Sequence, residues 1–183
     1  MTALPALETA DAPEAARPTL AKVAAAYGAV PNLMKAMSNS PQALDAYLAI
    51  SGLVDAAAFS AAEKQVVQQA VNLEHGCAYC LAAHSAMGKM GGVDGALDAA
   101  LRGGAPLADA KLDALRAFTL SVVRGRGHVP AGATEAFFAA GYDARALMDV
   151  LLIVTQKVMS NYTQHIAQAP LDAVFAPFAM EAA

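Results

Sequence analysis

The 183-residue sequence contains no tryptophan and only two cysteines, and charged residues make up only 15% of it. Hydrophobic residues make up 57%, many of them alanine, and β-branched residues are scarce. Because alanine favours helix over every other conformation, this composition predicts an all-α protein. So small a charged fraction also indicates that neighbouring subunits cover part of the apolar surface, and we therefore expect an oligomer.

The sequence also lacks the features of nucleic-acid-binding and membrane proteins. The net charge is −4, and the densest positive segment, residues 122–129, holds only two arginines. The longest apolar run, residues 147–154, is far shorter than the roughly 20 residues that span a bilayer. The N-terminal region has no basic segment and is interrupted by Pro5, Glu8 and Asp11, unlike a signal peptide. We expect a cytoplasmic protein with no nucleic-acid or membrane partner.

Helix start and stop signals divide the remainder of the chain. Strong start signals occur at Ser40-Pro41, at the capping box Ser60-x-x-Glu63 and at Asp143. Apolar spacing and glycine stops predict helices over residues 19–28, 40–58, 60–76, 77–90, 93–104, 107–127, 130–142 and 143–169. No segment alternates with period two over more than four residues. We predict an irregular N-terminal arm over residues 1–18, followed by one all-α domain of about six to eight helices over residues 19–183.

Both cysteines lie in the short stretch "HGCAYCLAAH". On a helix, Cys77, Cys80 and His84 occupy positions i, i+3 and i+7 and therefore share one face. Gly76 ends the preceding helix, so Cys77 lies near a helix N-terminus, where the dipole favours a thiolate. His84, four residues after Cys80, favours Cys80 instead as the activated thiol. The residues alone leave open which thiol is more acidic.

Other interpretations of the pair exist. In a cytoplasmic protein, a CxxC pair is typically catalytic or metal-binding rather than a permanent disulfide. Zinc could use the two cysteines and His84 with His75 or Glu74 as a fourth ligand, but no second Cys/His pair follows. Inert packing is a further alternative, and a thioredoxin-like domain is excluded because no strands are predicted. The absence of a second ligand pair favours a redox dithiol without metal or cofactor.

The stretch "HGCAYCLAAH" resembles the CxxCxxxH core of the AhpD-like branch of the carboxymuconolactone decarboxylase family. The segments "GAVPNLMKAMSNSPQALDAYLAISGLV", "FSAAEKQVVQQAVNLEHGC" and "SNYTQHIAQAPLD" also look like parts of its peroxidase-related members. The resemblance implies an all-helical fold, a homotrimer or homohexamer, and thiol-dependent reduction of peroxides. It further implies that Cys80 attacks the peroxide, that Cys77 condenses with it to a disulfide, and that His84 joins the proton relay. The disulfide would be regenerated by a dithiol or a protein reductant that the sequence does not identify.

The sequence departs from the family pattern at two positions. Gln65 stands twelve residues before Cys77, where family members commonly carry a relay glutamate. Tyr79 stands inside the CxxC motif, where the best-studied members have histidine. We expect Glu74, the carboxylate nearest to the motif in sequence, to take over the relay. A lactone decarboxylase that does not depend on the thiols, or a helical assembly protein without enzymatic activity, are the alternative functions.

Overall fold

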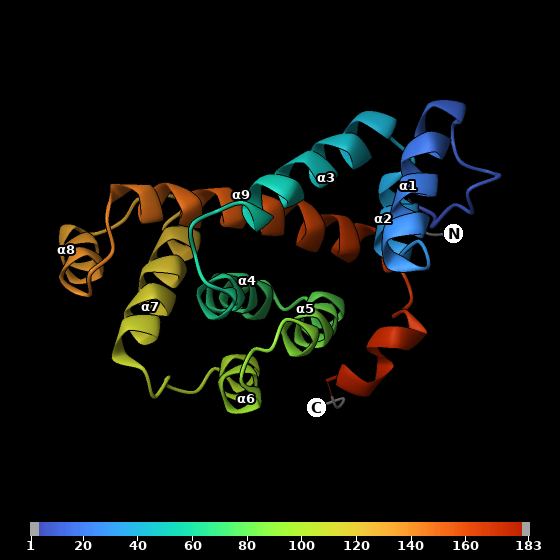
Figure 1. Cartoon of the computed structure of the whole chain (residues 1–183). Coiled ribbons are helices and arrows are strands. Elements are labelled where there is room, and N and C mark those ends of the chain that lie inside the picture. Colours follow the sequence, from blue (N-terminus) through green and yellow to red (C-terminus); the bar gives the residue numbers. More distant parts are fainter. Residues whose placement is uncertain (1–3, 181–183) are drawn as a thin grey trace.

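A computed structural model describes residues 4–180, and this part of the chain forms nine α-helices, two short 3-10 helices and no strand (Figure 1). The elements are η1 (Glu14–Ala16), α1 (Arg17–Tyr27), α2 (Asn32–Met37), α3 (Pro41–Asp55), α4 (Ala61–Glu74), α5 (Ala78–Met90), α6 (Gly95–Gly103), α7 (Ala110–Arg124), α8 (Ala131–Ala139), α9 (Ala144–Ala167) and η2 (Ala173–Phe178). The all-α prediction is confirmed, with more helices than the expected six to eight. Residues 1–3 of the predicted arm and 181–183 of the predicted domain lie outside the described part.

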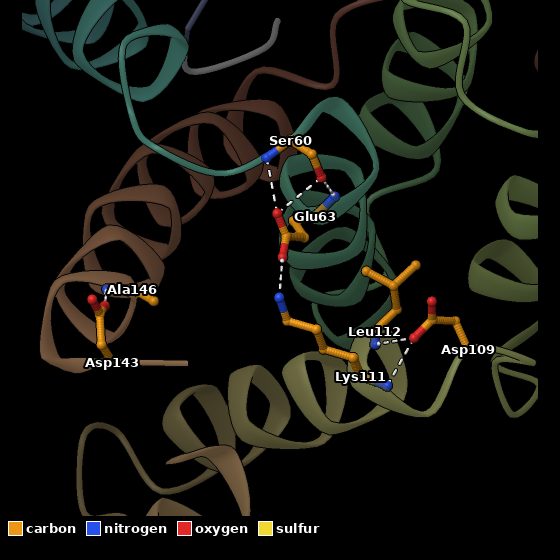
Figure 2. Close-up of polar contacts among 7 residues, drawn as sticks. All are labelled: Ser60, Glu63, Asp109, Lys111, Leu112, Asp143 and Ala146. Carbon is orange, nitrogen blue, oxygen red and sulfur yellow. Dashed lines mark hydrogen bonds and ion pairs between the residues drawn. The ribbon is translucent and has the colours of Figure 1, made fainter. Parts of the chain in front are cut away.

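The predicted start signals cap their helices. The Ser60 hydroxyl accepts a hydrogen bond from the Glu63 amide, and the Glu63 carboxylate accepts one from the Ser60 amide, which completes the capping box of α4. The Asp143 carboxylate caps α9 by accepting a bond from the Ala146 amide (Figure 2). Glu63 also pairs with Lys111 in the first turn of α7, so the same carboxylate caps one helix and links it to another.

Helix α4 lies in the middle of the fold and packs against α5, α6, α7 and α9 (Figure 1). One face contributes Val66 and Val67 to the larger core, which α7, α8 and α9 share. Stacked aromatic rings fill this core, with Phe137 between Phe118 and Tyr142. This core therefore fixes the position of α4, and another side of α4 packs against α5, where the cysteines lie.

The cysteines belong to a second, separate cluster. Cys77 and Cys80 pack there with Leu20, Leu44 and Tyr47, which come from α1 and α3. Helix α5 is buried on most of its circumference, from Tyr79 through Ala86. A helix buried all round has no clear amphipathic pattern, and α5 is held by its neighbours on every side. The thiols are thus enclosed by helices from both ends of the chain.

Helix α2 was not predicted, because the sequence pattern indicated only a turn at "VPNL". Its six residues are too few to be stable alone, so burial of Leu33 and Met37 stabilises it. Its first residue, Asn32, is bound by the segment that follows α9. We call this segment, residues 168–178, the C-terminal strap.

None of the helices within residues 4–180 has both the length and the apolarity needed to cross a membrane.

Candidate active site

A sharp turn places both thiols at the start of α5. Gly76 adopts a φ of +67°, a conformation that glycine reaches without steric penalty, and it turns the chain from α4 into α5. The Cys77 amide then donates to the Asn72 carbonyl oxygen over 2.9 Å. Cys77 is the N-cap residue and Cys80 lies one turn further on. Both are free thiols, with only 1% and 2% of their surfaces exposed.

Polar side chains from α4 and α9 surround the two thiols. The Asn161 amide donates to the Asn72 side-chain oxygen over 2.9 Å, and the Asn72 amide donates to the Cys80 carbonyl over 3.3 Å. His75 bonds through Nδ1 to the Asn161 side-chain oxygen at 3.0 Å. Since an amide oxygen only accepts, His75 Nδ1 carries the hydrogen. A chain of hydrogen bonds therefore runs from the partly exposed His75 to the backbone of Cys80.

His84 lies next to a buried lysine. The Nζ atom of Lys157, on α9, is 2.7 Å from Nε2 of His84. Burial, followed by the positive charge of Lys157, holds the pKa of His84 well below its usual range. His84 is therefore neutral at pH 7, its Nε2 accepts from the Lys157 ammonium group, and its hydrogen is on Nδ1.

The two thiols differ strongly in acidity. A hydrogen bond from the Cys77 thiol outweighs the opposing effect of burial, and with the charge of Lys157 it lowers the pKa of Cys80 to about 6. The same interaction, together with burial, raises the pKa of Cys77 far above its usual range. Of the two possibilities left open by the residues alone, this geometry favours Cys80 as the thiolate. The helix N-terminus does not make Cys77 the more acidic thiol, because Cys77 keeps its proton to stabilise its neighbour.

The structure does not bring Glu74 to this cluster. Both oxygens of its carboxylate accept hydrogen bonds from Arg124, over 2.9 and 2.8 Å. This pairing with Arg124 lowers the pKa of Glu74. Within residues 4–180, Glu74 makes no hydrogen bond to either thiol or to His84. Glu74 is the last residue of α4, and its carboxylate faces Arg124 on α7 instead of the thiols. Glu74 therefore does not have the geometry expected of a relay carboxylate.

Gln65 has a bridging role in the packing of three helices. Its amide nitrogen donates to the His84 carbonyl oxygen over 3.0 Å and to the Asp98 carboxylate over 2.9 Å. A Cβ atom added at Gly88 would lie 2.8 Å from the same nitrogen, so a larger residue there would displace the Gln65 amide. Gln65 thus joins α4 to α5 and α6, without contributing an acid or a base.

The C-terminal strap covers the first turn of α5. The Tyr79 hydroxyl, within the CxxC motif, donates to the Asp172 carboxylate, which also accepts from the Asn32 amide. The Phe175 ring meets the Tyr79 ring edge-on, with centroids 6.1 Å apart. Beside this contact, a shallow pocket of about 430 Å³ reaches Cys77 and is lined by Gly76, Cys77, Ala78, Tyr79, Gln164, His165, Gln168 and Ala169. This pocket brings the surface of the protein to Cys77, whereas Cys80 is not part of its lining.

Sequence reasoning missed Lys157, Asn161 and Asn72. The available signal was positional, because Lys157 and Asn161 continue the stripe of Val150 and Ile153 at helical spacing along α9. A lysine on the apolar stripe of a helix is unusual, since lysine is almost never fully buried without a partner. Asn72 offered no comparable signal.

A metal has no visible ligand set in this region. Across residues 4–180, no group of three or more His, Cys, Asp or Glu side chains is arranged to hold a metal ion. His75, one suggested fourth ligand, is bonded to Asn161, and Glu74, the other, is paired with Arg124. The geometry therefore gives no support to the zinc interpretation and leaves a dithiol with a histidine, a lysine and two amides around it.

Solved structures share this fold over nearly the whole chain. An alkylhydroperoxidase AhpD core, a peroxidase-related protein from Ralstonia eutropha JMP134, superposes with a TM-score of 0.83 at 20% identity, covering 95% of this chain and 94% of the other. A peroxidase-related protein from Silicibacter sp. TM1040 gives 0.79 at 23% identity, with 94% of each chain covered. The debrominase Bmp8, solved as a Cys-to-Ala variant with 2,3,4-tribromopyrrole, gives 0.81 at 16% identity, covering 97% and 96%.

These likenesses show that the chain has the all-helical fold of the AhpD core. The sequence profile of the carboxymuconolactone decarboxylase family matches residues 41–120, which run from the start of α3 into α7 and include both cysteines. This part of the chain is therefore similar to the carboxymuconolactone decarboxylase family. No curated protein sequence matches the chain significantly.

Proposed function

We propose that the protein is a thiol-dependent peroxidase that reduces hydrogen peroxide or an organic hydroperoxide with Cys80 and Cys77. The observation that supports this most strongly is the asymmetry of the buried pair, in which Cys77 lowers the pKa of Cys80 to about 6. A lowered pKa makes more of Cys80 thiolate at pH 7 than of an ordinary cysteine, which is about 3% ionised. The thiolate is the nucleophile in peroxide reduction, so Cys80 is the attacking residue.

The reaction proceeds in three balanced steps. The Cys80 thiolate attacks the hydroxyl oxygen of ROOH, the O–O bond breaks, and Cys80 becomes a sulfenic acid while RO⁻ takes up a proton to leave as ROH. The Cys77 sulfur then attacks the sulfenic sulfur, forming the disulfide, and the Cys77 proton leaves with the hydroxyl group as water. An external dithiol reduces the disulfide, is itself oxidised to a disulfide, and restores both thiols.

The first test is the behaviour of Cys80→Ser. We expect this variant to lose rapid consumption of cumene hydroperoxide, because serine at neutral pH is neither ionised nor able to form a sulfenic acid. Stopped-flow measurement of peroxide loss under single-turnover conditions, with the reduced protein and no added metal, checks it. If Cys80→Ser consumes peroxide as fast as the unaltered protein, the assignment of Cys80 is wrong.

Cys77→Ser serves as the matched control. It retains the attacking residue, so it reduces one equivalent of peroxide and stops at the Cys80 sulfenic acid, which dimedone traps. Intact-mass spectrometry then finds the dimedone adduct in Cys77→Ser and the disulfide, 2 hydrogens lighter than the dithiol, in the unaltered protein.

A second candidate reaction is reductive debromination, suggested by the likeness of the fold to the debrominase Bmp8. Two electrons from the dithiol and one proton would replace a carbon–bromine bond by carbon–hydrogen, releasing bromide and leaving the same disulfide. Incubation of the reduced protein with 2,3,4-tribromopyrrole distinguishes the two, since bromide release without reactivity toward hydroperoxides would favour debromination. Lactone decarboxylation, by contrast, would persist in both cysteine variants.

A further inference from the structure

Lys157 is a buried cation without an acidic partner. Only 1% of its surface is exposed, and the one hydrogen bond of its side chain within residues 4–180 is to His84 Nε2 at 2.7 Å. The four salt bridges in that part of the chain involve other residues, and no aspartate or glutamate pairs with Lys157. Burying an ammonium group costs several kcal/mol unless an opposite charge compensates it. Burial accordingly lowers the pKa of Lys157, and the charges of Cys80 and Cys77 oppose this effect, so an anion nearby would stabilise the ammonium form.

The groups that face Lys157 leave one choice for that anion. Helix α5 offers His84, which is neutral, and the thiols Cys77 and Cys80. Helix α3 offers the buried Tyr47, whose pKa is raised by burial, so it is uncharged. Helix α4 contributes amide side chains, since Gln69 and Asn72 donate to the Leu81 and Cys80 carbonyl oxygens of α5. Asp98 on α6 accepts from Gln65 and Gln69 and forms no ion pair with Lys157 within residues 4–180. Of the groups on α3 and α5, the thiol of Cys80 is the one whose anionic form is favoured.

We propose that Lys157 is the positioning cation of the dithiol: it compensates the Cys80 thiolate and supplies, through His84, the proton that the leaving alkoxide requires. The proton-supplying role rests on the proposed peroxidase function. The charge compensation rests instead on the contact between α5 and α9. It assigns to α9 the proton-supplying role that the sequence led us to expect from Glu74 on α4.

The proton balance follows from the charges. In the reduced state the site holds Lys157 as ammonium and Cys80 as thiolate, with no net charge. When the thiolate becomes a sulfenic acid, RO⁻ takes the hydrogen from Nδ1 of His84. Nε2 of His84 then takes a proton from the ammonium group, so that Lys157 ends as a neutral amine. The disulfide then carries no charge, and neither does the lysine. Reduction by an external dithiol returns two hydrogens, one of which moves back to Lys157 as Cys80 ionises.

Lys157→Met is the direct test, with iodoacetamide alkylation of Cys80 measured against pH in the Cys77→Ser background and in the intact dithiol. Methionine fills similar space without charge. We expect the alkylation midpoint of the intact dithiol to rise by at least about one pH unit, so that the rate at a pH well below the midpoint falls about tenfold. Lys22→Met, an exposed lysine on α1, is the matched control and leaves the midpoint in place. An unchanged midpoint in Lys157→Met overturns the proposal.

Lys157→Arg separates the two parts of the role. A guanidinium keeps the charge but does not release its proton at neutral pH. The alkylation midpoint therefore stays within about half a unit of the unaltered value, while peroxide reduction slows by at least tenfold, within the range attributed to general acids. Equal peroxide reduction by Lys157→Arg and the unaltered protein would disprove the proton-supplying part.

A measurement on the unaltered protein avoids any dependence on the variants folding. In protein labelled with ¹⁵N-lysine, the Nζ resonance of Lys157 reports whether the group is ammonium or amine. We expect ammonium in the dithiol form and amine in the disulfide form at pH 7, and identical protonation in both forms contradicts the proposal. Neither alkylation nor NMR uses peroxide. If the protein proves not to be a peroxidase, these two measurements still test whether Lys157 pairs with the Cys80 thiolate.

Discussion

Gln65 keeps its place through hydrogen bonds that a carboxylate could not make. Its amide nitrogen donates to a backbone carbonyl on α5 and to the carboxylate of Asp98 on α6. Asp98 also accepts from Gln69, so two amides satisfy one carboxylate. A glutamate here would turn a donor into an acceptor and set two carboxylates against each other. The departure from the family pattern at this residue is therefore built into the packing around it.

We expect Gln65→Glu to destabilise the protein and not to improve catalysis. The charged form of the new carboxylate is disfavoured in the folded state, so its folded pKa lies above its unfolded value. The loss of stability is then small below about pH 4 and grows as the pH rises through neutrality, by roughly 1–3 kcal/mol. Thermal melts at pH 5 and pH 8 measure it. The double variant Gln65→Glu with Asp98→Asn supplies a donor again and should recover most of the loss.

Individual site residues were predictable to different degrees. Cys77, Cys80 and His84 share a helix, so their spacing placed them on one face, and the structure brings Cys80 and His84 to the same group of buried side chains. The difference in acidity between the thiols was not predictable, because it depends on their mutual orientation and on Lys157. Lys157 lies 73 residues after His84 in the sequence, and only the packing of α9 on α5 brings the two together. The sequence prediction for Glu74 was based on proximity along the chain, which the pairing with Arg124 overrides.

At the scale of a helix, the start of α4 determines how the cysteine turn is held. Ser60 and Glu63 satisfy each other's backbone amides, and Glu63 extends a further contact to Lys111 on α7. Exposed caps of this kind contribute about 1 kcal/mol each. The cap is remote from the thiols, so a change there alters stability without altering their chemistry.

Ser60→Ala is expected to lower the free energy of unfolding by about 1 kcal/mol, because the Glu63 amide loses its acceptor. Chemical denaturation followed by circular dichroism measures the change. Glu63→Gln is the companion variant, since its amide oxygen can still accept from the Ser60 amide while the ion pair with Lys111 is lost; we expect a smaller loss. The alkylation rate of Cys80 should be the same in both variants, and a change in that rate would show that the cap influences the dithiol.

Helices with local signals were predicted well. Ser40, Ser60 and Asp143 each cap the helix that the sequence indicated. Helix α2 lacked such signals: Pro31 occupies its N-cap position without a capping side chain, and its stability depends on burial and on the bond from Asn32 to the strap. Local chemistry predicts where helices begin, whereas a helix that depends on distant contacts is not visible from sequence alone.

At the scale of the whole molecule, the C-terminal strap connects segments that are far apart in sequence. Asp172 accepts from Asn32 on α2 and from Tyr79 on α5. The Asn32 side chain also donates to the Pro170 carbonyl oxygen over 3.0 Å. One carboxylate therefore holds the two ends of the chain against the CxxC turn. Because Gln168 and Ala169 of the strap line the pocket beside Cys77, movement of the strap would change access to that pocket.

We expect Asp172→Ala to loosen the strap. Two donors lose their acceptor, at a cost of roughly 1–3 kcal/mol, and the cover over the pocket beside Cys77 opens more often. Hydrogen exchange in residues 170–178 should accelerate, and a bulky thiol reagent should react faster with the dithiol. Tyr79→Phe removes only one of the bonds and should show a smaller effect. Unchanged exchange in Asp172→Ala would mean that packing of Phe175, and not the carboxylate, holds the strap.

The edge-on contact between Phe175 and Tyr79 also gives the protein a natural place for an optical reporter. The chain has no tryptophan and five tyrosines, so its own near-ultraviolet emission is weak and spread over several positions. An indole introduced by Phe175→Trp would be the sole tryptophan, and it would stand over the residue between the two sulfurs. Its emission would change both when the strap lifts and when thiols become a disulfide, so one fluorophore could follow cover and chemistry in the same stopped-flow trace.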